Sequence, residues 1–193
     1  MNDSVPNGSS SFLQLGEYRN TGYTPGASLV CRLLWYVVNE AVFRTGWFPF
    51  SALKRTLLRV FGATIGPGVV IKPHVNIKFP WRLAVGEQSW IGEEAWIDNL
   101  DRVSIGQNCC VSQGVYLCTG SHDPRQPSFP LITRPIVIGD GVWVGARALV
   151  LGGVTIADNA VVAAGTTVIR NVAENDLVVG VGGVSKGRVR PVE

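Results

Sequence analysis

The chain has 193 residues, of which 46% are hydrophobic and 16% charged, and its formal net charge is +3. This composition excludes a disordered chain, and the small positive charge without a dense Lys/Arg stripe argues against a nucleic-acid partner. Four cysteines without CxxC spacing give no disulfide framework and favour a reducing, cytoplasmic location. Residues 1–11 are polar and lack the basic start of a secretory signal.

Two segments near the N-terminus predict helices. Residues 25–45 and 50–61 show no six-residue period, and Ser51 and Gly62 are suitable residues to begin and end the second helix. We expect residues 1–62 to form a polar tail followed by a helical cap over one end of the domain that follows.

The most apolar stretch, residues 29–43, contains Arg32, Asn39 and Glu40. It is therefore too short and too polar to span a bilayer. Its apolar face could still meet a membrane surface as a peripheral contact.

A six-residue repeat begins after this region. A period of six fits neither a helix nor a plain strand, and instead indicates a short strand followed by a turn. Offsets of twenty and then eighteen residues between equivalent positions indicate three hexads per coil, so the sequence predicts an all-β parallel β-helix over residues 63–178. The recurring aliphatic positions are Ile65, Ile71, Ile77, Val85, Ile91, Ile97, Val103, Ile105, Val111, Leu117, Ile138, Val144, Val150, Ile156, Val162 and Val168.

Residues 123–137 interrupt the repeat with four prolines and lose its phase. A proline-rich loop extruded from a strict solenoid indicates an active-site loop rather than decoration. Residues 179–193 follow the last hexad as a basic C-terminal tail.

Three segments resemble the hexapeptide-repeat O-acetyltransferases: the hexads from Ile105 to Leu117, the Thr-Gly-Ser-His-Asp segment 119–123, and the Ile-Gly-Asp-Gly-Val-Trp-Val-Gly segment 138–145. Residues 96–100 and 118–123 resemble the colanic-acid-biosynthesis type more closely than the galactoside and maltose types. The resemblance implies a left-handed β-helix, a homotrimer with active sites between protomers, acetyl-CoA as co-substrate, no metal, and a sugar or glycan-precursor acceptor.

The resemblance marks His122 as the catalytic base. A histidine titrates near neutral pH and can remove the proton of a sugar hydroxyl, which then attacks the thioester. Asp98 and Asn99 belong to the hexad stacked one coil below, so we expect them on the same side as His122, where they could bind acceptor hydroxyls. The alternative is a turn that satisfies its own backbone.

The donor side is implied by the same resemblance. Trp143, Gly145 and Ala146 would lie along the pantetheine arm, and Ala164 and Gly165 would continue that wall one coil above. The alternative for Trp143 is a contact between protomers. Arg170, with the basic residues Lys186, Arg188 and Arg190, could meet the CoA phosphates, although the family's Gly-Asn-Pro-Ala-Lys segment is replaced here by Gly182-Gly-Val-Ser-Lys186.

Rival functions are less well supported by the sequence. A carbonic anhydrase on this fold needs three zinc-binding histidines, whereas the chain has two. An ice-binding solenoid would lack the extruded loop. A non-catalytic subunit, another acyl donor or a non-sugar acceptor remain as alternatives.

Overall fold

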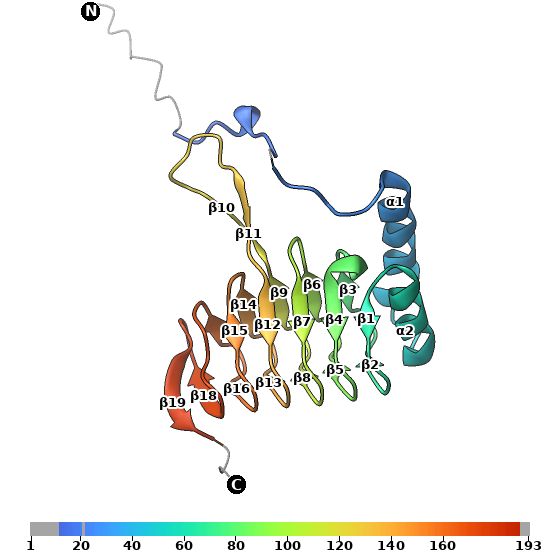
Figure 1. The fold of residues 1–193 in the computed structure, drawn as a ribbon, viewed down its shortest axis with the longest axis vertical. Helices are drawn as coiled ribbons and strands as arrows, with labels where there is room; N and C mark the ends of the chain where they lie inside the picture. Colours follow the sequence, from blue (N-terminus) through green and yellow to red (C-terminus); the bar gives the residue numbers. More distant parts are fainter. Residues whose placement is uncertain (1–11, 21, 190–193) are drawn as a thin grey trace, which may run out of the picture.

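The computed structural model describes residues 12–20 and 22–189. They form a parallel β-solenoid with a helical cap at one end and a hairpin that projects from its side (Figure 1). The cap consists of α1 (Leu29–Val38), a π-helical turn η2 (Asn39–Phe43) and α2 (Ser51–Val60), preceded by the short 3-10 helix η1 (Leu15–Glu17). None of the described helices has the length and apolarity needed to cross a bilayer.

The solenoid has three faces, here called sheets A, B and C, whose strands pair in parallel from coil to coil except for the last strand of sheet B, which is antiparallel. Sheet A contains β1 (Thr64–Ile65), β4 (Leu83–Val85), β7 (Val103–Ile105), β12 (Ile136–Ile138) and β15 (Thr155–Ile156). Sheet B contains β2 (Val70–Ile71), β5 (Trp90–Ile91), β8 (Cys110–Val111), β13 (Trp143–Val144), β16 (Val161–Val162), β18 (Asp176–Val179) and β19 (Val184–Arg188). Sheet C contains β3 (Asn76–Ile77), β6 (Trp96–Asp98), β9 (Tyr116–Cys118), β14 (Leu149–Leu151) and β17 (Thr167–Val168), and the 3-10 turn η3 (Pro80–Arg82) joins β3 to β4.

The predicted repeat is confirmed by the strand register. Ile65 pairs with Val85, which pairs with Ile105, whereas Ile138 pairs with Ile156. These are the predicted offsets of twenty and eighteen residues. The aliphatic residues of the repeat point inward and are buried, so that successive coils share one continuous core.

Corners between the faces need a backbone that few residues accept. Left-handed φ values recur six residues apart, for example at Gly141, Arg147, Gly153, Asn159 and Gly165. Glycine and asparagine tolerate this conformation best, which accounts for their frequency in the repeat.

The helical cap satisfies the hydrogen bonds that the first coil would otherwise leave open. The Ser51 hydroxyl accepts from the Ile71 N–H at 3.0 Å and donates to the Ile71 carbonyl at 3.1 Å. The Trp35 indole donates to the Ile77 carbonyl at 2.8 Å. Three side chains of α2 donate hydrogen bonds to further carbonyls of the same coil. Arg59 donates to the Ile65 carbonyl, Arg55 to the Val69 carbonyl and Lys54 to the Lys72 carbonyl.

Details of the cap differ from the sequence prediction. The first helix begins at Leu29 rather than at residue 25, because Ser28 caps it by accepting from the Cys31 N–H at 3.2 Å. Ser51 was predicted to cap α2, which is wrong, because its hydroxyl is bonded to Ile71 across the interface. Gly62 does end that helix region, with φ +90°.

The boundaries of the extruded segment also differ. The chain leaves sheet C after Cys118 and already forms β10 (Gly120–His122), and it is back in sheet A at Ile136, which is fully buried. The predicted loop 123–137 therefore starts and ends too late, because an antiparallel pair leaves no six-residue signal. Within the predicted basic C-terminal tail, β19 pairs antiparallel with β18.

Candidate functional site

An antiparallel hairpin carries the predicted base. β10 pairs with β11 (Leu131–Thr133), and the hairpin projects from the corner between sheets C and A (Figure 1). Its turn is organised by Asp123, whose carboxylate accepts from the backbone N–H of Arg125 at 3.0 Å and from its guanidinium at 2.9 Å. These hydrogen bonds hold the pKa of Asp123 well below its usual range. An ionised, well-bonded Asp123 thus fixes the end of the strand on which His122 lies.

The imidazole of His122 is held in one orientation. Its Nδ1 lies 2.8 Å from the carbonyl oxygen of Phe129, and its ring stacks on the Phe129 ring with centroids 4.4 Å apart and 2° between the planes. A carbonyl can only accept, so Nδ1 donates and, in the neutral ring, Nε2 carries the lone pair. Phe129 adopts a left-handed φ of +48° in the turn that contains this carbonyl. The half-buried His122 therefore presents a basic nitrogen opposite the anchored one.

The N-terminal segment also reaches the hairpin, which sequence reasoning missed. The Gln14 N–H donates to the Pro127 carbonyl at 2.8 Å, and the Tyr18 ring lies 5.9 Å from the His122 ring, centroid to centroid. No motif marked this segment, because it belongs to no repeat.

Asp98 stacks in register with Cys118, four residues before His122. Its carboxylate accepts from the Tyr116 hydroxyl at 3.0 Å and pairs with the Lys78 ammonium at 2.9 Å. Because the chain departs into the hairpin after Cys118, no hydrogen bond joins Asp98 to His122 among the described residues. The predicted stacking of the two hexads is present, but it does not bring these two side chains into contact.

Asn99 is fully buried, and its side-chain amide is hydrogen-bonded to backbone groups. The side-chain oxygen accepts from the Phe79 N–H at 2.9 Å, and the side-chain nitrogen donates to the Phe79 carbonyl at 2.6 Å. The partner is not the local turn that the sequence analysis gave as the alternative, because Phe79 lies twenty residues away, in the coil below. An acceptor contact through Asn99 stays a prediction.

Sequence reasoning also missed the partners of Asp98. Trp96 and Tyr116 stack with centroids 4.5 Å apart, and the Tyr116 hydroxyl is bonded to Asp98. Burial, together with Cys118 and Asp98, raises the pKa of Tyr116, so its hydroxyl stays protonated and donates. The twenty-residue offset, applied to outward as well as inward positions, would have placed Lys78 beside Asp98.

Trp143 lies on the outer surface of sheet B and is half exposed. Its indole N–H donates to the Ser112 hydroxyl at 3.0 Å, and Cys110 is its neighbour in the coil below. Trp90, one coil further down the same column, is exposed to a similar degree. An exposed aromatic ring with its polar atom already bonded offers a flat apolar wall.

The turn after Trp143 has a structural reason for its small residues. A Cβ on Gly145 would lie 2.6 Å from the backbone nitrogen of Ala164, so glycine allows the two coils to stack. Gly165 adopts φ +69°, and its N–H donates to the Ala146 carbonyl at 2.8 Å. Among the described residues, the N–H groups of Ala146 and Ala164 donate to no backbone carbonyl. Two such donors in successive coils fit a thin amide chain laid along this corner.

The basic residues near the C-terminus are solvent-exposed. Arg170 follows β17, and Lys186 and Arg188 lie on β19. Arg190 lies outside the described residues. A contact of Arg170 with the phosphates of CoA stays a prediction.

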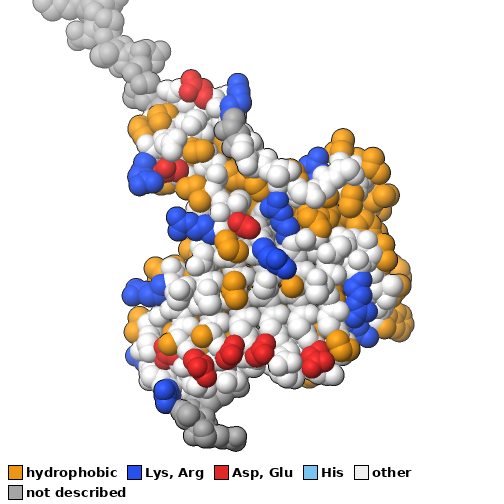
Figure 2. Space-filling model, in the orientation of Figure 1, with side chains coloured by type: hydrophobic (Ala, Val, Ile, Leu, Met, Phe, Trp, Pro, Cys, Tyr) orange, Lys and Arg blue, Asp and Glu red, His pale blue; other side chains and the backbone are white. Residues whose placement is uncertain are grey.

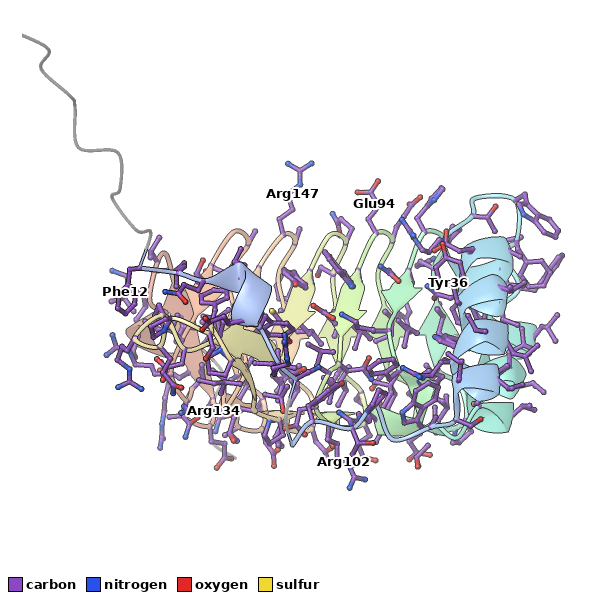
Figure 3. All side chains as sticks on the ribbon, turned by 90° about the horizontal axis from the view of Figure 1, so that it is seen from above. Phe12, Tyr36, Glu94, Arg102, Arg134 and Arg147 are labelled. Atoms are coloured by element: carbon purple, nitrogen blue, oxygen red, sulfur yellow. The ribbon has the colours of Figure 1, made fainter. Side chains whose placement is uncertain are left out.

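Within a single chain, the predicted base and the predicted donor-binding corner lie on different sides of the solenoid. The hairpin with His122 leaves the corner between sheets C and A, whereas residues 145–148 form the corner between sheets B and C. Figure 3 shows Arg134, at the foot of the hairpin, and Arg147, in the turn after Trp143, on opposite long sides of the solenoid. Sheet C lies between them, so a base and donor wall from the same chain do not face each other.

Comparisons with known proteins agree with this architecture. Residues 135–170 match the family described as bacterial transferase hexapeptide (six repeats). The chain is 38% identical over 152 residues to the colanic acid biosynthesis acetyltransferase WcaF of Escherichia coli strain K12. The match covers 78% of this chain and 82% of that protein. It is 27% identical over 131 residues to the galactoside O-acetyltransferase of the same strain, covering 66% of this chain and 64% of that protein.

A solved structure shows the same fold. The hexapeptide-repeat acetyltransferase VCA0836 of Vibrio cholerae O1 biovar eltor, in complex with acetyl-CoA, superposes with a TM-score of 0.75 at 24% identity, covering 86% of this chain and 92% of that one. The chain belongs to the hexapeptide-repeat acetyltransferase family, and its solenoid is the left-handed parallel β-helix of that family.

Proposed function

We propose that this protein transfers an acetyl group from acetyl-CoA to a hydroxyl of a sugar used in surface-polysaccharide biosynthesis, with His122 as the general base. The observation that carries the proposal is the bond from His122 Nδ1 to the Phe129 carbonyl, which leaves Nε2 as the basic atom. The likeness to the colanic acid and galactoside enzymes supports the acceptor class. The four free cysteines agree with a reducing, cytoplasmic setting.

The reaction requires one proton to move twice. His122 Nε2 takes the proton of the acceptor hydroxyl as the oxygen forms a bond to the thioester carbonyl carbon. When the carbon–sulfur bond breaks, the imidazolium returns that proton to the departing sulfur, which leaves as free CoA thiol. The Nδ1 bond to Phe129 keeps the ring in place through both transfers.

The donor is assigned to the corner at residues 145–148 and the ring of Trp143. The unpaired N–H groups of Ala146 and Ala164 suit the amides of pantetheine, and the exposed Trp143 ring suits its apolar segments. Acetyl-CoA in the related Vibrio cholerae complex supports this choice of donor. Asp98, held by Tyr116 and Lys78, is the carboxylate assigned to the acceptor.

A homotrimer completes the site. Since His122 and the Ala146 corner flank sheet C on opposite sides, we assign the base of each site to one protomer and the donor wall to its neighbour. Mixing two inactive variants tests this arrangement. His122→Ala and Ala146→Trp, unfolded together and refolded, should regain activity that neither shows alone, because some interfaces then join two intact halves. No recovery from mixed oligomers would contradict shared sites.

The reaction itself is tested by release of CoA thiol from acetyl-CoA, with a panel of hexoses, deoxyhexoses and nucleotide sugars. Acceptor-dependent release that is lost in His122→Ala supports the proposal. Release that persists in the variant would remove His122 as the base. Intact acetyl-CoA binding without release to any acceptor would favour a non-catalytic subunit.

A further inference from the structure

The outer face of α1 is apolar and uncovered. Six of its ten residues are large or branched apolar side chains that are more than half exposed, whereas Trp35 is its one buried residue. A helix on a water-soluble surface normally turns polar side chains to solvent. The exposed residues are Leu29 61%, Val30 66%, Leu33 58%, Leu34 57%, Tyr36 63% and Val37 62%.

Aromatic rings extend this apolar surface between the helices. Trp47 and Phe50 are 71% and 64% exposed, and both contact Phe48 edge-on, with centroids 5.4 and 5.3 Å apart. Figure 2 shows hydrophobic side chains gathered over the cap, in contrast to the mixed surface of the coils. Tryptophan and tyrosine favour the boundary between lipid and water, where one part of the ring is apolar and another is polar.

Positive charge lies beside this surface. Residues 29–60 contain five Lys and Arg but only one Glu, and Lys54, Arg55 and Arg59 bond carbonyls of the first coil, which leaves Arg32 and Arg44 beside α1. A cavity of about 310 Å³ next to α1 has three cations in its lining, Arg32, Arg44 and Lys78, and one carboxylate, Glu40. Arg44 pairs with Glu40 and Lys78 with Asp98, whereas the Arg32 Nε has no hydrogen-bond partner in the described part of the chain. Among the described residues no carboxylate pairs with Arg32, so its guanidinium brings an uncompensated positive charge to this cavity.

The cap closes one end of the solenoid, where α1 and α2 lie side by side (Figures 1 and 3). A protomer packed alongside the coils would leave this end free. We propose that the cap docks on a lipid bilayer with anionic headgroups, with the apolar face of α1 and the Trp47–Phe50 aromatic residues in the interface and Arg32 against lipid phosphate. Burial of apolar side chains and attraction to anionic lipid together give binding of this interfacial kind.

The test measures co-sedimentation of the full chain with vesicles of phosphatidylcholine and with vesicles in which about a quarter of the lipid is phosphatidylglycerol. The wild type should bind, more strongly to the anionic vesicles. Leu33→Asp/Val37→Asp should lower the ratio of bound to free protein roughly tenfold or more, because it places two charges in the buried face. Arg32→Gln should reduce the preference for anionic lipid and leave weak binding to phosphatidylcholine.

The matched control is Val181→Asp/Val184→Asp, which changes two exposed valines at the other end of the solenoid and should bind vesicles as the wild type does. Circular dichroism and light scattering accompany each variant. Wild-type protein that stays in the supernatant with both vesicles would overturn the proposal. So would a fall in oligomer mass in Leu33→Asp/Val37→Asp, since a second copy of the chain would then cover the face. Acetyl transfer to a soluble acceptor is independent of this test, so either proposal can fail alone.

Discussion

The ring of His122 lies parallel to the ring of Phe129, while its Nδ1 is bonded to the backbone carbonyl of the same residue at 2.8 Å. One residue thus fixes both the plane of the imidazole and its tautomer. The carbonyl sets which nitrogen is protonated, and the side chain limits rotation of the ring.

His122→Ala should lower kcat by about two to four orders of magnitude, the usual contribution of a general base. Acetyl-CoA affinity should be unchanged, because His122 lies on the hairpin and not at the donor corner. Steady-state thiol release and equilibrium binding of acetyl-CoA measure the two quantities. A variant with wild-type kcat would refute the assignment.

Phe129→Leu separates the two contacts of Phe129. The backbone carbonyl remains, so the tautomer is kept, but the stacked ring is lost. An aromatic pair contributes about 0.5–1.5 kcal/mol, so kcat should fall only about two- to tenfold. The pH profile of kcat should keep its shape. A loss as large as that of His122→Ala would mean that the ring, and not the carbonyl, holds the base.

Trp143→Ala should raise the KM for acetyl-CoA roughly tenfold, equivalent to ~1.4 kcal/mol, and leave the KM for the acceptor nearly unchanged. Trp90→Ala is the matched control, because Trp90 has similar exposure in the same column of sheet B. Equal effects of the two substitutions would place Trp143 in a general surface or protomer contact.

Gly145→Ala should destabilise the fold by ~1–3 kcal/mol, since its Cβ would lie 2.6 Å from the Ala164 nitrogen and would force the coils apart. Ala146→Ser, at the neighbouring half-exposed position, should change stability by less than about 0.5 kcal/mol. Denaturant unfolding of both variants provides the comparison. A stable Gly145→Ala protein would show that the coils can separate without cost.

Lys54 is completely buried against Phe43, and burial lowers its pKa below 10.5. Between the lowered pKa and 10.5, the unfolded chain binds more protons at this site than the folded chain. The unfolding free energy should therefore rise with pH in that window, and it should do so more in the wild type than in Lys54→Met. Denaturant unfolding at a series of pH values from about 7 to about 10 measures this dependence. If the unfolding free energy of both proteins changed equally with pH, a titrating Lys54 would be excluded.

The coils could be predicted from the sequence because their inward positions are aliphatic residues that recur at a fixed spacing. The register of Ile65, Val85 and Ile105 follows from that spacing. The hairpin could not be placed so well, because it is held by Asp123 and the Phe129 carbonyl and not by a repeat. Ser51 was misassigned for a similar reason. Its partner, Ile71, is twenty residues away, whereas helix-capping rules consider only local bonds.

The side chains that bond the first coil have a consequence for assembly. A solenoid of parallel strands is a template at both ends, because each open coil presents the same hydrogen-bonding pattern to any further chain. Here Ser51, Trp35 and Arg59 occupy one end, and the antiparallel strand β19 covers the edge of sheet B at the other. Because both ends are covered in this way, no further chain can add a coil to the solenoid. Without its cap, the same coils would be free to polymerise end to end into fibres.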